Sequence, residues 1–271
     1  DEGSPLMVHS QALLADLKPM LPEFELALSM RYGTPSIADG FALLKAAGCE
    51  RVIVLPLFPQ YAEATTGSIE GRVEALSAPH WKPSEITVVP AFFDDPGFLS
   101  AFADVGRPVL TDKQPDHVLF SFHGLPESHI RRADKTGKHC LEKNNCCDAI
   151  TEVNASCYRA QCMASARGIA SRLELEPDQW SVSFQSRLGR TPWLSPYTDK
   201  VVVELAESGV KRLAVYCPSF VADCLETLEE IGLRAGEEFR EAGGESLELV
   251  PSLNSTALWT QAVAKLVRGA S

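Results

Sequence analysis

Short, almost continuous apolar runs alternate with longer segments of helical spacing along the whole chain. The runs lack the strict alternation of apolar and polar positions that a half-exposed strand shows, so they fit strands buried on both faces of a parallel sheet. They predict strands at residues 25–30, 51–55, 86–90, 117–122, 180–184, 212–216 and 247–250. The segments between them predict helices at residues 11–20, 36–47, 68–77, 97–105, 155–173, 198–208, 224–241 and 257–267.

The repeated order of strand, helix and strand predicts an α/β fold with parallel sheets flanked by helices. With 271 residues, the chain has room for two compact lobes or for one large domain. A polar stretch at 111–116, which contains Lys113 and Pro115, interrupts the apolar pattern. We predict a division into two lobes there, after residue 112.

Charge and composition argue against some classes of function. The chain is 45% hydrophobic and 23% charged, which is ordinary for a folded globular protein. Its net charge of -11 argues against a nucleic-acid partner, because phosphate binding depends on clustered Lys and Arg. No apolar run reaches the roughly 20 residues of a membrane-spanning helix, and residues 1–5 resemble neither a signal peptide nor a natural start. We expect part of a longer cytoplasmic protein, with peripheral contact to the inner membrane left open.

A histidine directly follows the apolar strand predicted at 117–122. His123 precedes Gly124 and Pro126, which break regular structure. Ligands of open α/β sheets gather at the carboxyl ends of strands, and an imidazole there can accept a proton near neutral pH. A histidine that only satisfies loop hydrogen bonds explains the position equally well.

Two glutamates follow the strand predicted at 212–216. Glu226 and Glu230 are four residues apart, so on a helix they share a face and can act together on a cation or in a proton path. An exposed acidic helix face is the simpler explanation for such a pair taken alone.

Several segments, taken together and in their order, resemble the ferrochelatases. The two active-site segments of that family are similar to SFHGLP at 121–126 and PSFVADCLETLEE at 218–230. Its porphyrin-facing loop is similar to PLFPQYAEATTGS at 56–68, and further matches are MRY at 30–32, FQSRLG at 184–189 and WLSPYTD at 193–199. The resemblance covers essentially the whole chain. It implies two Rossmann-like lobes, 1–112 and 113–252, with a porphyrin cleft between them, and a C-terminal helix in 253–271 that packs back on the first lobe.

The activity that this resemblance implies is insertion of ferrous iron into protoporphyrin IX, with release of two protons. His123 would accept protons or contact the iron substrate, and Glu226 and Glu230 would move protons or guide the iron. The alternatives are a chelatase for another metal or tetrapyrrole, such as cobalt or coproporphyrin, and a noncatalytic porphyrin-binding or iron–sulfur sensor protein. The oligomeric state stays open.

Aromatic and cationic residues in the matched segments are candidates for porphyrin binding. Aromatic groups would hold the macrocycle and favour a bent ring, which exposes the nitrogen lone pairs. Arg31 would meet a porphyrin carboxylate, unless it forms an ordinary surface ion pair. Each aromatic residue taken alone is more often part of a core. The candidates are Arg31, Tyr32, Tyr61, Trp193 and Phe220.

A cysteine-rich insert at 134–162 predicts a metal centre. The chain has eight cysteines, and five of them lie between positions 140 and 162, which is unlike a disulfide framework. Thiolates hold both structural zinc and iron–sulfur clusters. Resemblance to ferrochelatases with an internal cysteine segment favours a [2Fe-2S] cluster over zinc. The predicted ligands are Cys140, Cys147, Cys157 and Cys162, with Cys146 as the alternative.

Two features depart from the family pattern. Many ferrochelatases have histidine where this chain has Cys224, so a thiol here either replaces the imidazole near the metal path or only packs. Family members also have an earlier strand, a glycine-containing loop and a helical lip upstream of the segment that opens this sequence. We expect these parts to lie outside the present sequence.

Overall fold

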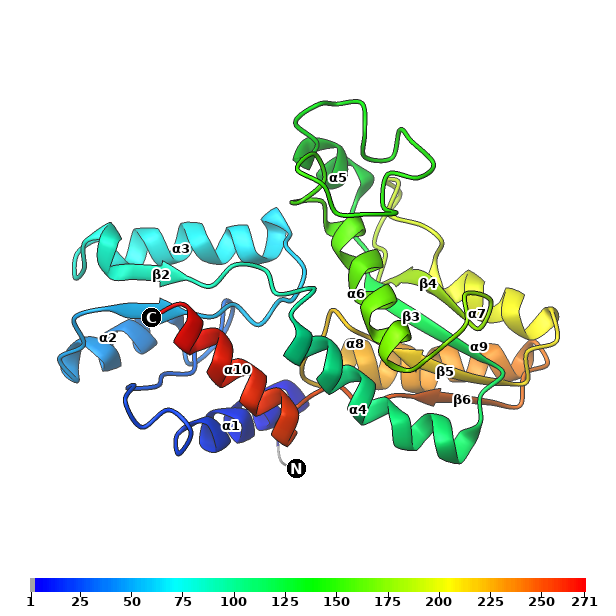
Figure 1. Ribbon diagram of the computed structural model, residues 1–271, viewed down its shortest axis with the longest axis horizontal. Helices are drawn as coiled ribbons and strands as arrows, with labels where there is room; N and C mark the ends of the chain where they lie inside the picture. The colour runs from blue at the N-terminus through cyan, green and yellow to red at the C-terminus, as the bar shows by residue number, and fades with distance from the viewer. Residues whose placement is uncertain (1–2) are drawn as a thin grey trace.

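The computed structural model describes residues 3–271 as two parallel sheets, each packed against helices (Figure 1). The first sheet pairs β1 (Val52–Val54) with β2 (Ile86–Val88). The second has four strands in the order β4-β3-β5-β6, all parallel. Their bounds are β3 (His117–His123), β4 (Trp180–Gln185), β5 (Arg212–Tyr216) and β6 (Ser246–Leu249). The prediction of an α/β fold with parallel sheets is confirmed.

The helices begin at local signals that the sequence carries. α2 starts at a capping box, in which Ser36 accepts from the Asp39 amide and the Asp39 carboxylate accepts from Ser36. α4 starts with Asp95 as its cap and Pro96 in its first turn. The helices are α1 (Pro5–Leu17), α2 (Ile37–Ala46), α3 (Ser68–Ser77), α4 (Pro96–Lys113), α5 (Glu127–Ala133), α6 (Tyr158–Arg172), α7 (Thr198–Glu207), α8 (Leu225–Thr227), α9 (Gly236–Glu241) and α10 (Ala257–Gly269), the π-helical η1 (Glu63–Gly67) and η3 (Leu228–Ala235), and the 3-10 turn η2 (Pro83–Glu85).

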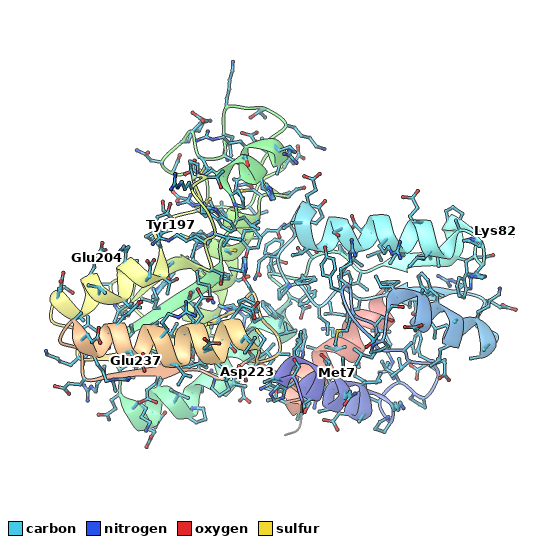
Figure 2. The ribbon with its side chains drawn as sticks, turned by 180° about the vertical axis from the view of Figure 1, so that it is seen from behind. Met7, Lys82, Tyr197, Glu204, Asp223 and Glu237 are labelled. Atoms are coloured by element: carbon cyan, nitrogen blue, oxygen red, sulfur yellow. The ribbon has the colours of Figure 1, made fainter. Side chains whose placement is uncertain are left out.

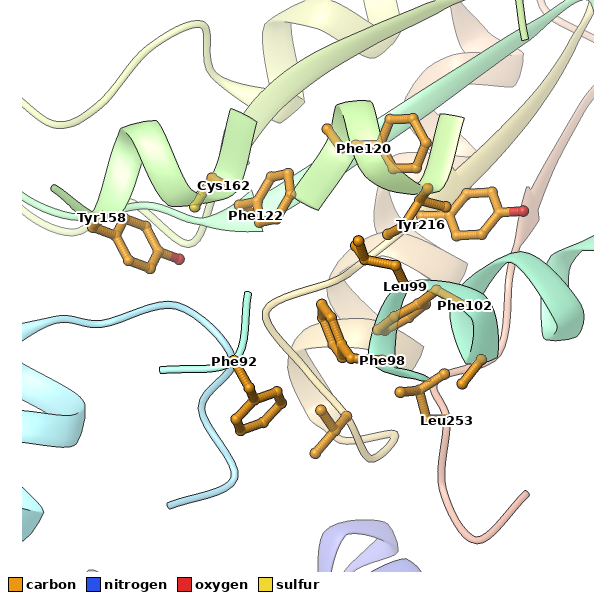
Figure 3. Packing of buried hydrophobic residues seen from close by; sticks show 14 of the residues in the cluster. Phe92, Phe98, Leu99, Phe102, Phe120, Phe122, Tyr158, Cys162, Tyr216 and Leu253 are labelled. Carbon is orange, nitrogen blue, oxygen red and sulfur yellow. The ribbon is translucent and has the colours of Figure 1, made fainter. Parts of the chain in front are cut away.

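Strand β3 is buried on both faces, which explains its continuous apolar run. Leu119 packs into the core on one face, whereas Phe120 and Phe122 belong to the larger core on the other. Figure 3 shows Phe120 and Phe122 in that larger core, near Tyr158 of α6 and Tyr216 of β5. The arrangement holds the carboxyl end of β3, and so His123, on a rigid support.

The two sheets are joined through α4, α10 and the segment after β6. α4 packs against α6 and against α10, and α10 also contacts α1 (Figure 1). Asp223 lies at the end of the α8 region that faces the first sheet (Figure 2). Its carboxylate accepts hydrogen bonds from Thr227, the Ser252 amide and Asn254. The helix that carries Glu226 is therefore fixed to the chain that returns to the first sheet.

The strand predicted at 25–30 is not formed. Met30 makes only an isolated bridge to Ser36, and its amide donates to the Pro35 carbonyl. A strand needs a neighbour for its backbone groups, and within residues 3–271 the first sheet offers this segment none. Apolar character alone therefore does not produce a strand here.

Replacing Gly106 with alanine should destabilise the fold. Gly106 of α4 faces β5, and a Cβ there would lie 1.6 Å from the Tyr216 hydroxyl oxygen. Overpacking of this kind costs about 1–3 kcal/mol of unfolding free energy, measurable by denaturant titration. Gly71 of α3 is the matched control, since its Cβ would meet nothing within 4 Å. Gly71→Ala should be neutral or slightly stabilising, and equal losses for both variants would contradict the close packing of α4 on β5.

Candidate active site

The side chain of His123 stands at the carboxyl end of β3, half-buried, with a defined tautomer. Its Nδ1 lies 2.6 Å from the Gly124 carbonyl oxygen, which can only accept, so Nδ1 carries the proton. In the neutral ring Nε2 then has a free lone pair. The ring centroid of Phe220 lies 6.1 Å from that of His123. His123 is thus arranged to accept a proton or to bind a metal through Nε2.

The carboxylate of Glu230 is held at the carboxyl end of β4, the strand next to β3. Its carboxylate accepts from the Ser186 amide at 2.7 Å and from the Ser186 hydroxyl at 2.5 Å. Gln185 donates to the same carboxylate at 3.4 Å and to the Glu226 carbonyl at 2.8 Å. Gln185 also pairs with His123 in the sheet. One residue therefore connects the histidine with the segment that carries both glutamates.

Glu226 differs from Glu230 in its surroundings. Glu226 is exposed, while Glu230 is half-buried. The glutamates sit where α8 passes into π-helical turns, a change that apolar spacing does not reveal. An exposed carboxylate four residues before an anchored one suits capture of a hydrated cation followed by transfer inward.

Cys224 lies beside Glu226 as a neutral thiol. Burial first, and then a hydrogen bond with Glu226, raise the pKa of Cys224 to about 12. Its amide also bonds to the Thr227 hydroxyl. Without a nearby cation this thiol stays protonated at neutral pH.

Of the aromatic candidates, Trp193 and Phe220 lie beside the His123 segment, whereas Tyr61 is bonded to α6. Trp193 packs beside the His123 loop, since a Cβ on Gly124 would lie 3.3 Å from its ring. The Trp193 indole N–H has no hydrogen-bond partner within residues 3–271. The Tyr61 amide donates to Gln161 of α6 at 2.6 Å. Burial, followed by the charges of nearby glutamates, raises the pKa of the Tyr61 hydroxyl, which stays a neutral phenol.

Arg31 and Tyr32 lie at the first sheet. Arg31 Nε donates to Ser68 at the start of α3, 2.9 Å away, and the guanidinium lies 4.5 Å from the ring centre of Tyr32. Arg31 and Arg72 line a cavity of about 190 Å³. Tyr32 itself is 78% exposed. The contacts of Arg31 are therefore with the first sheet and its helix α3.

The five cysteines of the insert are all buried and gather near the start of α6. Cys146 and Cys147 have their sulfur atoms 3.7 Å apart, and Arg159 donates to Cys147 at 3.2 Å. A hydrogen bond to Cys157 and then burial raise the pKa of Cys147. Burial raises the pKa of the other contacting thiols, Cys140, Cys146 and Cys162. Among the described residues every cysteine is free of disulfides.

The loop that carries Cys140 is folded around one buried carboxylate. Asp134 accepts from Thr136, from the His139 amide and from the Cys140 amide. These bonds, led by the Thr136 hydroxyl, hold the pKa of Asp134 well below its usual range. The insert lies beside α5 and leads into α6 (Figure 1), and its cysteines belong to the same core as Phe122 of β3.

The donor set of the insert suits a metal centre, although the ligands are not already placed around an ion. Buried thiols with a single guanidinium nearby are kept neutral, and a bound cation would reverse this by taking thiolates as ligands. Across residues 3–271 no three His, Cys, Asp or Glu side chains are arranged to hold a metal ion as they stand. The thiols would therefore have to turn toward it.

Within the same range, none of the helices combines the length and apolar character needed to cross a membrane.

The structure thus places His123, Glu230, Trp193 and Phe220 at one sheet edge. The main chain of Glu226 is bonded to Gln185 at this edge, and its side chain is exposed. Sequence reasoning missed Gln185 and Ser186, which anchor Glu230, and Tyr158 and Ser219, which bond to the His123 main chain. It also missed exposed apolar side chains near the glutamates, Leu225 and Leu228. Of these residues, only Gln185, Ser186 and Ser219 lie in the segments that match the family, and that position is the one sequence signal that could have identified them.

Comparison with known proteins identifies relatives along the whole chain. The family model described as Ferrochelatase matches residues 1–271. A protein of Pseudomonas fluorescens (strain Pf0-1) named ferrochelatase is 47% identical over 267 residues, which are 98% of this chain and 78% of that protein. A ferrochelatase of Coxiella burnetii (strain Dugway 5J108-111) is 46% identical over 268 residues, 98% of this chain and 74% of its own length.

Solved structures with a similar fold are chelatases at low sequence identity. SirB from Bacillus subtilis with Fe3+ has a TM-score of 0.62 at 16% identity, and the match covers 99% of this chain and 92% of SirB. CbiX, described as the terminal enzyme for biosynthesis of siroheme in denitrifying bacteria, has a TM-score of 0.61 at 13% identity, covering 100% of this chain and 94% of CbiX. These two likenesses concern the fold.

Proposed function

Since the chain belongs to the ferrochelatase family and inserts ferrous iron into a porphyrin, we propose that His123, Glu226 and Glu230 carry this reaction on protoporphyrin. The enzyme is a lyase-class metal chelatase of heme biosynthesis. The observation that supports the assignment is the 2.6 Å contact of His123 Nδ1 with the Gly124 carbonyl oxygen, which leaves Nε2 free to accept a proton at the strand edge. Gln185 links this edge to the glutamates.

Metallation removes two pyrrole protons while iron exchanges water for four ring nitrogens. His123 accepts a pyrrole proton through Nε2. Glu226, exposed, receives hydrated iron and Glu230, anchored by Ser186, takes up charge or protons during transfer. Carboxylate oxygens suit a hydrated divalent ion, and holding one of them in place orients the approach.

The macrocycle lies against apolar side chains on the edge of the second sheet. Trp193 and Phe220 line it next to His123, and the exposed Leu225 and Leu228 extend that surface. Tyr61 and the pair Arg31 and Tyr32 approach from the first sheet, where the two arginines of the cavity suit porphyrin carboxylates. The division into lobes after residue 112 and the porphyrin cleft between them are part of this proposal.

The insert holds a [2Fe-2S] cluster through Cys140, Cys147, Cys157 and Cys162. Contacts of Cys157 with both Cys140 and Cys147 support these three ligands. Cys146 adjoins Cys147 and is the alternative, and zinc is the alternative metal. The cluster would supply a structural or redox-sensing centre, since metal insertion needs no electron transfer. Cytoplasmic location and peripheral contact with the inner membrane stay predictions.

Anaerobic mixing of the purified protein with ferrous iron and protoporphyrin tests the proposed function. We expect protein-dependent loss of porphyrin fluorescence and growth of heme absorption. Coproporphyrin and cobalt, used in parallel, serve as competing substrates. Faster turnover of either would overturn the protoporphyrin assignment, and porphyrin binding without any metal insertion would support a sensor.

A further inference from the structure

The main chain of His123 is held by two side chains from other parts of the sequence. Tyr158, in the first turn of α6, donates its hydroxyl proton to the His123 carbonyl at 2.8 Å. The His123 amide donates to the Ser219 hydroxyl at 3.3 Å, and Ser219 lies in the loop after β5. The two hydroxyl oxygens are 2.9 Å apart.

Counting protons shows which hydroxyl donates in the contact between Tyr158 and Ser219. A tyrosine hydroxyl has one proton, and a carbonyl can only accept, so the Tyr158 proton is committed to His123. Ser219 must therefore donate to the Tyr158 oxygen. The bonds form a closed ring that runs from the His123 amide through Ser219 and Tyr158 to the His123 carbonyl. A closed ring fixes both polar groups of the residue at once, and its members polarise one another.

We propose that Tyr158 and Ser219 are positioning residues for His123 in metal insertion. They reach no reacting atom by any contact in the structure, but they set the height and direction from which the imidazole leaves the strand. A misplacement of about 1 Å at a catalytic group lowers turnover about 100-fold. The inference rests on the proposed role of His123.

The burial of Tyr158 strengthens this interpretation. Its side chain is 7% exposed and packs in the larger core with Phe122, the strand residue before His123 (Figure 3). The aromatic ring is therefore held in place by packing, and only the hydroxyl is bonded to His123. Tyr158→Phe removes that hydroxyl and keeps the packing.

Tyr216 provides a matched control. It is a buried tyrosine of the same core, but its hydroxyl has no hydrogen-bond partner within residues 3–271. Figure 3 shows Tyr158 and Tyr216 at opposite ends of the drawn cluster. Tyr216→Phe makes the same chemical change at a place without contact to His123.

The experiment measures steady-state insertion of ferrous iron into protoporphyrin and, separately, porphyrin binding by fluorescence. We expect Tyr158→Phe to lower kcat about 10- to 100-fold with KM and porphyrin affinity nearly unchanged, and Tyr216→Phe to match the unaltered protein. Ser219→Ala should give a similar loss. Because both residues belong to one ring, the double variant should lose little more than either single variant.

Unchanged kcat in both Tyr158→Phe and Ser219→Ala would overturn the inference. So would losses that multiply in the double variant, or a loss that Tyr216→Phe shares. If Tyr158→Phe does not fold, Ser219→Ala in the half-buried loop still decides between these results. Lack of insertion by the unaltered protein would instead refute the proposed function, so the two failures are distinguishable.

Discussion

His123→Ala should nearly abolish iron insertion while leaving porphyrin binding close to normal. The imidazole provides a free Nε2 at the edge of the sheet, and neither nearby glutamate occupies that position. Loss of a general base lowers turnover about 10²- to 10⁴-fold. Binding should survive, because in the proposed site the macrocycle is held by apolar area from Trp193, Phe220 and the exposed leucines. Heme formation and porphyrin fluorescence titration measure the two quantities.

His80→Ala is the control for this variant. His80 is exposed just after the end of α3, beside Trp81, and has no contact with the strand edge. It should turn over like the unaltered protein. Near-normal insertion by His123→Ala would contradict the assigned role, and equal loss of binding and turnover would point to a collapsed site.

The sequence predicted most of the fold because the second sheet is built from sequence-local signals. Strand β3 is apolar on both faces and is buried on both, so its run of apolar residues was a sufficient sign. Residues 25–30 carried a similar run but form no strand. Strand formation depends on a partner, and pairing is a property of distant segments that an apolar pattern does not contain.

The sequence predicted the reactive residues of the site but not the residues that hold them in place. His123 ends β3, and Glu226 and Glu230 lie in the helical segment that follows β5. Ligands of α/β sheets gather at such strand ends, and the matched motifs point to the same three residues. Tyr158 carries no such signal, because a tyrosine at the start of a helix is most simply interpreted as a core residue. Its hydroxyl meets His123 only because α6 packs beside β3, which is a long-range contact.

The π-helical turns after α8 illustrate a third feature that the sequence does not predict. Apolar spacing predicted one helix at 224–241, and a helix is present across most of that range. The wider turns of η3 change the direction in which side chains leave the axis. Glu230 can then bond to Ser186 of the neighbouring strand end. Spacing along the sequence gives no measure of such a change.

Cys157→Ala should remove the visible absorption of the cluster and destabilise the insert. In the proposed centre Cys157 is one of four ligands and interacts with both Cys140 and Cys147, so its loss would leave three ligands. Loss of a structural metal site lowers the free energy of unfolding by more than about 4 kcal/mol. Because Tyr158 directly follows Cys157, insertion should also fall. Visible spectra, iron and sulfide content, and thermal unfolding report these effects.

Two further cysteine variants make this prediction specific. Cys146→Ala should keep the absorption bands, because Cys146 is the cysteine left over when the four proposed ligands are filled. Cys49→Ala should also keep them, since Cys49 lies at the first sheet, where its carbonyl accepts from the Trp81 indole. Bands that vanish with Cys146 and persist with Cys157 would reverse the ligand assignment. Bound zinc without visible bands would replace the cluster by a zinc site, because zinc with the same thiolates absorbs no visible light.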